Sequence, residues 1–152
     1  SRVLRFYKNI IMDVAFISCV KEKRIGKHKA KDLYTSDFFK KSVGYCSSKH
    51  DCVYILSAKF GLLDMEDKIE NYEMTLNDFS KDEKIKWSTM VHEQIKNKID
   101  DSDDLYFYVG NNYREHLLPM LNNNYYVPLE GKGIGEQLKY LKNNMERKHD
   151  FF

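Results

Sequence analysis

The stretch Asp13-Val14-Ala15-Phe16-Ile17-Ser18 decides the fold class, because it is a short apolar run that ends in a polar residue. Such a run is typical of a strand that is buried on both faces of a parallel sheet. The pattern returns at residues 52–57 (CVYILS), and a third apolar run at residues 105–109 (LYFYV) is closed by Gly110. We expect these three runs to lie parallel in one sheet.

Segments with helical spacing of apolar residues separate these runs. Helices are expected at about residues 34–48, 80–99, 113–121 and 134–147. Thr35 or Ser36 would cap the first, and SKDE at residues 80–83 is a capping box with Glu83 at its third helical position. A long connection from Ala58 to Ser80 turns at Gly61, and Tyr125-Tyr126-Val127 predicts a short fourth strand that Pro128 ends.

Strands that alternate with helices predict parallel strands joined by right-handed crossovers. We therefore expect an α/β fold, a single three-layer domain with a mainly parallel sheet of about four or five strands. The length of 152 residues, with 42% hydrophobic and 32% charged residues, fits one folded domain. Residues 12–152 should form that domain, and residues 1–11 an N-terminal extension or an edge strand.

Cysteine usage and hydropathy restrict the environment of the protein. The three cysteines (Cys19, Cys46 and Cys52) are an odd number without a CxxC pair, which favours free thiols and a reducing, cytoplasmic location. No run of 18 apolar residues occurs, so we expect no membrane partner. The histidines show no HxxxH or HExxH spacing, and we predict no metal and no cofactor. The oligomeric state is left open.

The distribution of charge leaves two interpretations open. The net charge of +2 is too small by itself to indicate a nucleic-acid-binding protein. The segment from Lys21 to Lys31 is nevertheless rich in lysine and arginine, whereas residues 64–104 hold most of the acidic side chains. The basic segment is either an ordinary solvated surface or a surface that binds an anion.

Polar segments come directly after the ends of all the predicted strands. They are residues 18–23 (SCVKEK), 57–61 (SAKFG), 110–114 (GNNYR) and 129–135 (LEGKGIG). Ligands of parallel sheets bind beyond the carboxyl ends of the strands, and small residues let backbone amides approach an anion. GKGIG matches neither a P-loop nor a G-x-G-x-x-G motif. We therefore expect a single site at this edge without a known nucleotide-binding loop.

Individual residues of these segments allow more than one role. Ser18 and Cys19 could form a pair of nucleophiles, although cysteine is also a common small buried residue. Lys59 either binds a phosphate or points into solvent. The location predicts that Ser18, Lys21, Ser57, Lys59 and Arg114 surround one pocket.

Five ordered motifs between Met12 and Leu141 resemble a family of bacteria and phages that is known only as a domain of unknown function. They are SCVKEK, KDLYTSDFF, YILSAKFGLLDMEDKIENYEMTL, YVGNNYREHLLPML and PLEGKGIGEQLKYL. Within them, LSAKFGLLDMEDKIENY (residues 56–72) is also similar to LSGLYGLL-x-P-x-D-x-I-x-x-Y, the signature of the peroxide-stress protein YaaA family. That second resemblance is shorter and more distant.

The resemblance implies a function connected with nucleic acids. The YaaA family is associated with DNA binding and with protection from oxidative damage, and a similar segment occurs in archaeosine enzymes whose fold resembles uracil-DNA glycosylases. The expected ligand is therefore a nucleobase, a nucleotide or a nucleic acid, with cleavage or exchange of a glycosidic bond as the expected reaction class. The alternative is a noncatalytic, DNA-binding stress-response protein.

Matching positions give the candidate site residues. They are Ser18, Cys19, Lys21, Lys23, Asp32, Tyr34, Ser57, Lys59, Gly61, Tyr72, Gly110, Tyr113, Arg114, Gly131, Gly133, Gly135 and Gln137. The cations among them could form an anion clamp, and the tyrosines could offer stacking faces to a base. Asp32, Ser18 and Cys19 are the catalytic candidates, with Asp32 as general base or water-orienting group. Asp32 could instead pair with a lysine, and the Tyr72 hydroxyl could instead tie down the long connection.

Overall fold

The central sheet of the computed structural model, which describes residues 10–18 and 23–144, has five strands. They are β1 (Asp13–Ser18), β3 (Cys52–Ser57), β4 (Gly61–Asp64), β6 (Asp104–Tyr108) and β7 (Tyr125–Tyr126), in the spatial order β4-β3-β1-β6-β7. β1 pairs in parallel with both β3 and β6, and β7 is parallel to β6. β4 alone is antiparallel, to β3. The predicted parallel arrangement of the first three runs is confirmed.

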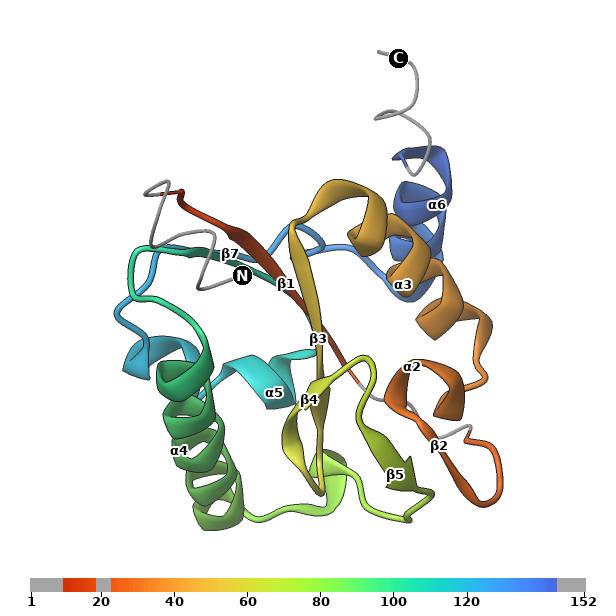
Figure 1. Ribbon diagram of the computed structural model, residues 1–152, viewed down its shortest axis with the longest axis horizontal. Coiled ribbons are helices and arrows are strands. Elements are labelled where there is room, and N and C mark those ends of the chain that lie inside the picture. Colours follow the sequence, from red (N-terminus) through yellow and green to blue (C-terminus); the bar gives the residue numbers. More distant parts are fainter. Residues whose placement is uncertain (1–9, 19–22, 145–152) are drawn as a thin grey trace.

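Helices cover both faces of this sheet and complete three layers (Figure 1). α3 (Asp37–Lys49) and α6 (Ile134–Asn144) lie on one face, and α4 (Lys81–Lys98) and α5 (Asn111–Arg114) lie on the other. Alternate residues of β1 serve the two cores: Val14 and Phe16 pack with α4, whereas Ala15 and Ile17 pack with α3 and α6. Burial on both faces explains the continuous apolar runs, and the expected α/β fold is confirmed.

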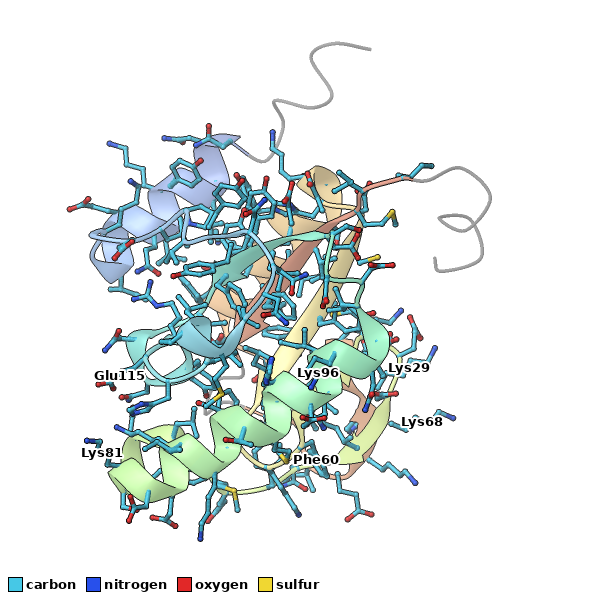
Figure 2. All side chains as sticks on the ribbon, turned by 90° about the vertical axis from the view of Figure 1, so that its left-hand side faces the viewer. Lys29, Phe60, Lys68, Lys81, Lys96 and Glu115 are labelled. Atoms are coloured by element: carbon cyan, nitrogen blue, oxygen red, sulfur yellow. The ribbon has the colours of Figure 1, made fainter. Side chains whose placement is uncertain are left out.

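Helix caps agree closely with the sequence. Ser36 caps α3 by accepting from the Phe39 N–H, and Ser80 caps α4 in the predicted capping box with Glu83. Figure 2 shows α4 from outside, with Lys81 at its beginning and Lys96 near its end. No helix within residues 10–18 and 23–144 combines the length and the apolar character that crossing a bilayer requires. Residues 1–9 of the predicted extension lie outside the described part.

The predicted helix at residues 113–121 is wrong. The chain forms only α5 and a single turn of 3-10 helix, η2 (Leu118–Met120). Pro119 lies in the first turn of η2, where its missing N–H is tolerated, but an α-helix through it would lose a hydrogen bond and clash with the preceding turn. The fourth strand is also one residue shorter than expected.

The connection from Ala58 to Ser80 contains structure that the sequence did not predict. Besides β4 it holds β5 (Lys68–Glu70) and a 3-10 turn, η1 (Leu76–Asp78). β5 pairs antiparallel with β2 (Lys27–Lys29), and together they form a small ribbon that leads into α2 (Ala30–Leu33). We call β2, β5 and the tip formed by residues 24–26 the β2–β5 ribbon. It lies at a corner of the molecule, outside the three layers (Figure 1).

Candidate functional site

A cavity of about 390 Å³ opens at the carboxyl ends of β1, β6 and β7. Ser18, Gly110 and Arg114 line one part of it, and Gly131 and Gln137 line another. These five predicted site residues come from segments far apart in the sequence, and the parallel strands bring them together. The volume lies in the range of small-molecule pockets. We call this space the carboxyl-edge cavity.

Arg114 is the most informative side chain of the carboxyl-edge cavity. It lies at the end of α5, and its Nε is shielded from solvent. Among the residues that the structure describes, this Nε has no hydrogen-bond partner. A buried N–H without an acceptor is costly, and folded proteins rarely leave one. The position therefore suits a ligand that brings an acceptor, above all an anionic oxygen.

The loop between β7 and α6 forms the opposite wall. Gly131 adopts the left-handed backbone conformation, with φ of 79°, and the Lys132 N–H donates to the Leu129 carbonyl at 3.2 Å. The Gln137 side chain donates through Nε2 to the Lys132 carbonyl at 2.9 Å, which ties the loop to α6. The Lys132 ammonium, 5.4 Å from the ring centroid of Tyr140, supplies a second cation to the cavity lining. Gln137 thus holds the loop that carries this cation.

Apolar and aromatic groups complete the carboxyl-edge cavity. Phe38 from α3 and Leu129 contribute apolar surface. Tyr108, the last residue of β6, also lines it, and its hydroxyl lies 2.6 Å from His50 Nε2. Burial raises the pKa of Tyr108 above its usual value, so this phenol stays neutral. The cavity therefore combines two cations, Arg114 and Lys132, with neutral aromatic and aliphatic surface.

The carboxyl end of β3 is filled by protein. The Ser57 hydroxyl donates to the Tyr72 hydroxyl at 2.7 Å, and the Tyr72 and Tyr34 hydroxyls are 2.8 Å apart. Ser57 Oγ also accepts from the backbone N–H groups of Lys59 and Phe60, at 3.3 and 3.2 Å. Ser57, Tyr34 and Tyr72 are all buried. The alternative role of Tyr72, a core hydroxyl that ties down the long connection, is the one that the structure shows.

Lys59 does not join Arg114, and the predicted convergence of five residues on one pocket is wrong in this respect. Lys59 is exposed, with its ammonium 5.3 Å from the Phe60 ring centroid, and neither it nor Ser57 lines the carboxyl-edge cavity. The reason is topological, because β3 turns directly back into β4 rather than entering a crossover. Lys21 and Cys19 lie outside the described residues.

Gly61 and Tyr113 have structural surroundings. Gly61 has a φ of 71°, and a Cβ placed there would lie 2.3 Å from Gln94 Oε1. Gln94, from α4, accepts from the Leu62 N–H at 2.8 Å and donates to the Phe60 carbonyl at 3.1 Å, so it clamps the turn. Tyr113 packs edge-on against the Trp87 ring, at 5.4 Å. Neither residue lines the carboxyl-edge cavity.

A second cavity, of about 400 Å³, brings Lys23 and Tyr72 together. The Lys23 ammonium lies 4.6 Å from the Tyr72 ring centroid, and Glu73, Thr75 and Asp78 complete much of the lining. Two of the predicted site residues therefore contribute to a cavity of mixed charge, separate from the one that contains Arg114. Its two carboxylates make it a poorer site for an anion than the carboxyl-edge cavity.

Asp32 and the basic segment are engaged elsewhere. Asp32 is exposed on α2 and lines neither cavity, while its backbone carbonyl accepts from Arg24 Nε at 3.0 Å. Lys29 and Lys31 both bind Glu66, each at 2.8 Å. These hydrogen bonds to Lys29 and Lys31 lower the pKa of Glu66 to about 2. Part of the positive charge of the basic segment is thereby neutralised.

The remaining predicted glycines lie outside the carboxyl-edge cavity, and the described cysteines belong to no metal site. Gly133 and Gly135 are exposed around the beginning of α6 and do not line the carboxyl-edge cavity. Cys46 and Cys52 carry reduced thiols, and burial raises the pKa of Cys46. Among the described residues, no three histidine, cysteine, aspartate or glutamate side chains gather as a metal site.

Several cavity residues were missed by sequence reasoning. Asn111 and Lys132 stand inside the quoted motifs GNNYR and GKGIG, so their polar side chains after strand ends were a usable signal. Glu130 comes after Leu129 in the same loop. Phe38 carried no such signal, because its helical spacing indicates only a core position.

Comparison with known proteins places this arrangement in a family. The model of a family of unknown function, DUF6884, matches residues 14–143. The uncharacterized protein YfjM of Bacillus subtilis (strain 168) is 30% identical over 130 residues, which cover 82% of this chain and 85% of that protein. Apart from Asp13 at the beginning of β1, the matched region includes all five strands of the sheet, and it includes the residues named above in the carboxyl-edge cavity. The chain therefore belongs to the DUF6884 family.

Proposed function

We propose that the protein binds a nucleotide, either free or as part of a nucleic acid, in the carboxyl-edge cavity. The observation that carries this proposal is the buried Nε of Arg114, which lacks an acceptor among the described residues. A guanidinium presents several N–H groups in one plane and binds phosphate oxygens strongly. In this proposal Arg114 holds a phosphate, and Lys132 adds a second positive charge.

The walls of the cavity suit the rest of a nucleotide. Phe38 and Leu129 offer apolar surface to a base or a sugar, and Gly110 and Gly131 leave room for close approach to the backbone. The distant resemblance of residues 56–72 to the YaaA family supports a ligand of the nucleic-acid class. The resemblance supports the class of ligand but not its location in the carboxyl-edge cavity. Residues 56–72 lie mainly at the carboxyl end of β3, which is filled by protein side chains.

Cleavage or exchange of a glycosidic bond is the reaction class within this proposal. Such a reaction uses a carboxylate to activate water or to stabilise the developing charge on the sugar. Glu130 lines the carboxyl-edge cavity, whereas Asp32 does not. We therefore assign the role of candidate catalytic carboxylate to Glu130 in place of Asp32.

Calorimetric titration with nucleosides, nucleotides and single- and double-stranded DNA tests the binding proposal. Arg114→Gln should weaken nucleotide binding by about 1.5–3 kcal/mol, since a charge-assisted hydrogen bond is lost. Lys59→Gln is the matched control, because Lys59 is a cation after a strand end that does not line the carboxyl-edge cavity. Equal affinities for wild type and Arg114→Gln, with the fold intact, would contradict the proposal.

Chromatography of the same mixtures tests the reaction class. Free base should accumulate with wild type and be lost in Glu130→Gln, while nucleotide affinity stays within a few-fold. Binding without base release would reject the glycosidic reaction and favour the noncatalytic, DNA-binding alternative.

A further inference from the structure

The tip of the β2–β5 ribbon carries an isoleucine in full contact with water. Ile25 is 90% exposed, more than any other large apolar side chain in the described part of the chain. A single exposed apolar residue is common on protein surfaces and carries little meaning alone. The rigidity and the charge of the tip around it set Ile25 apart.

Hydrogen bonds hold the backbone of the tip on both sides of Ile25, and before it the Arg24 N–H donates to the Leu33 carbonyl at 2.7 Å. The Ile25 carbonyl lies 2.8 Å from His28 Nε2, and the Gly26 carbonyl accepts from the Asn71 N–H at 3.3 Å. Gly26 has a φ of 92°, a conformation that suits glycine and turns the chain sharply. The fold thus fixes the loop while leaving its one large apolar side chain in solvent. Because its backbone is already held, the tip loses less conformational freedom when a partner binds.

Two basic side chains flank the tip. Arg24 precedes Ile25, Lys27 comes after Gly26, and both are exposed. Glu70 opposes Lys27 across the ribbon. Lys68 opposes Lys29 at the end of the ribbon away from the tip, where Lys29 also binds Glu66 (Figure 2). The tip therefore presents one apolar side chain between two exposed cations, Arg24 and Lys27, with the Glu70 carboxylate opposite Lys27. That combination complements a polyanion that also offers apolar surface.

We propose that the tip of the β2–β5 ribbon is a contact for duplex nucleic acid. Ile25 inserts as an apolar wedge at a base step, and Arg24 and Lys27 contact the adjacent phosphates. A membrane surface is a poorer match, because one apolar side chain buries too little area to hold a protein on lipid. This inference rests on the proposed nucleotide function, which it deepens by making a duplex the partner.

The geometry of the chain allows one duplex to reach both places. Ser18 lines the carboxyl-edge cavity and is seven residues from Ile25 in the sequence. Seven extended residues span at most about 25 Å. Adjacent base pairs are about 3.4 Å apart, so this span is about seven base pairs. The tip and the rim of the cavity at Ser18 are therefore at most about seven base pairs apart along a duplex.

Fluorescence anisotropy with a labelled duplex tests the tip. Ile25→Ala should weaken duplex binding by about tenfold, since three carbon atoms leave the wedge. Because a mismatched step is easier to unstack, wild type should prefer a mismatched duplex, and Ile25→Ala should lose that preference. Ile11→Ala is the matched control, because Ile11 is an exposed isoleucine (60%) near the other end of β1. It should change neither measurement.

Two further titrations separate this inference from the proposed function. Mononucleotide binding should be the same in Ile25→Ala and wild type, because Ile25 does not line the carboxyl-edge cavity. Unchanged duplex affinity in Ile25→Ala, with nucleotide binding present, overturns the tip proposal and leaves the proposed function standing. Vesicles of an anionic phospholipid supply the second arm. Binding to them that depends on Ile25, without an effect on the duplex, also overturns the tip proposal.

Discussion

The carboxyl ends of β6 and β3 are similar in sequence but differ in structure. Both strands end in an apolar run that a small residue follows. A basic residue comes one position after Ala58 (Lys59) and four positions after Gly110 (Arg114). After β6 the chain enters α5, and Arg114 lines a cavity. After β3 the chain turns back as β4, and hydroxyls of Ser57, Tyr72 and Tyr34 occupy the space. One end is open to a ligand and the other is closed by the protein.

The segment after a strand therefore decides whether the end of that strand can form a site. A crossover leaves its loop above the sheet edge, where side chains face the space beyond the strands. An antiparallel hairpin keeps the chain in the plane of the sheet and satisfies its polar groups at once. Substitutions at the open end of β6 should thus change ligand affinity, and substitutions at the closed end of β3 should change the free energy of unfolding.

Gly61→Ala should give the largest loss of stability, about 2–4 kcal/mol, because a left-handed backbone disfavours a Cβ and two hydrogen bonds are disturbed. The added Cβ would lie 2.3 Å from Gln94 Oε1, which holds the turn between β3 and β4. Denaturant unfolding measures the change. Gly135→Ala is the control: Gly135 lies in α6 with open space where a Cβ would be added, and the substitution should stabilise the fold by about 0.5–1 kcal/mol. Equal stabilities of the two variants would show that Gly61 and Gln94 do not hold the turn between β3 and β4.

Tyr72→Phe should cost about 1–3 kcal/mol of stability, because the buried Ser57 and Tyr34 hydroxyls lose a common partner. Nucleotide affinity should not change, since Tyr72 does not line the carboxyl-edge cavity. Thermal unfolding together with calorimetry checks both parts. Tyr125→Phe, at an exposed position on β7, should be neutral in each. Lost affinity in Tyr72→Phe with unchanged stability would place the ligand at the closed end instead.

Glu66→Gln should have the smallest effect. Glu66 binds Lys29 and Lys31, and these hydrogen bonds lower its pKa from 4.5 to about 2. A lowered carboxyl pKa stabilises the fold above about pH 4.5, and this contribution fades as the pH falls toward about 2. As the pH falls through this range, the melting temperature should decrease slightly less for Glu66→Gln than for wild type. Identical profiles would mean that the two lysines hold Glu66 too weakly to matter.

The same substitution probes the neighbouring charge. Freeing Lys29 and Lys31 should raise DNA affinity modestly and steepen its dependence on salt, because more counterions are released. Anisotropy titrations at several salt concentrations measure this slope. An unchanged slope would show that these lysines lie away from the nucleic acid.

Much of the fold was predictable because its signals are local. The apolar runs of β1, β3 and β6 and the caps at Ser36 and Ser80 fix both the elements and their alternation. The β3–β4 hairpin was not predicted from the sequence. Its signal was a short turn after β3 that ends at Gly61 and is followed directly by the apolar residues Leu62 and Leu63. β2 and β5 carried no signal, since short charged segments such as KHK have low strand propensity. They form through contacts with distant segments.

The candidate site was predictable only in part, for a similar reason. Ser18, Gly110, Arg114, Gly131 and Gln137 meet because strand ends of a parallel sheet share one edge. That rule treats all strand ends alike, so it could not separate Lys59 from Arg114. Pairing between Tyr72 and Ser57, or between Lys31 and Glu66, depends on tertiary contacts that no local pattern specifies.

The most direct test of an open site at β6 and a closed one at β3 is an NMR titration of isotope-labelled protein with a nucleoside monophosphate. The Arg114 side-chain Nε–H signal should shift most, accompanied by the Gly110 and Gly131 amides. The amides of Ser57 and Tyr72 should stay in place, because neither residue lines the carboxyl-edge cavity. Shifts confined to Lys59, Tyr72 and their neighbours, with Arg114 unchanged, would contradict the account.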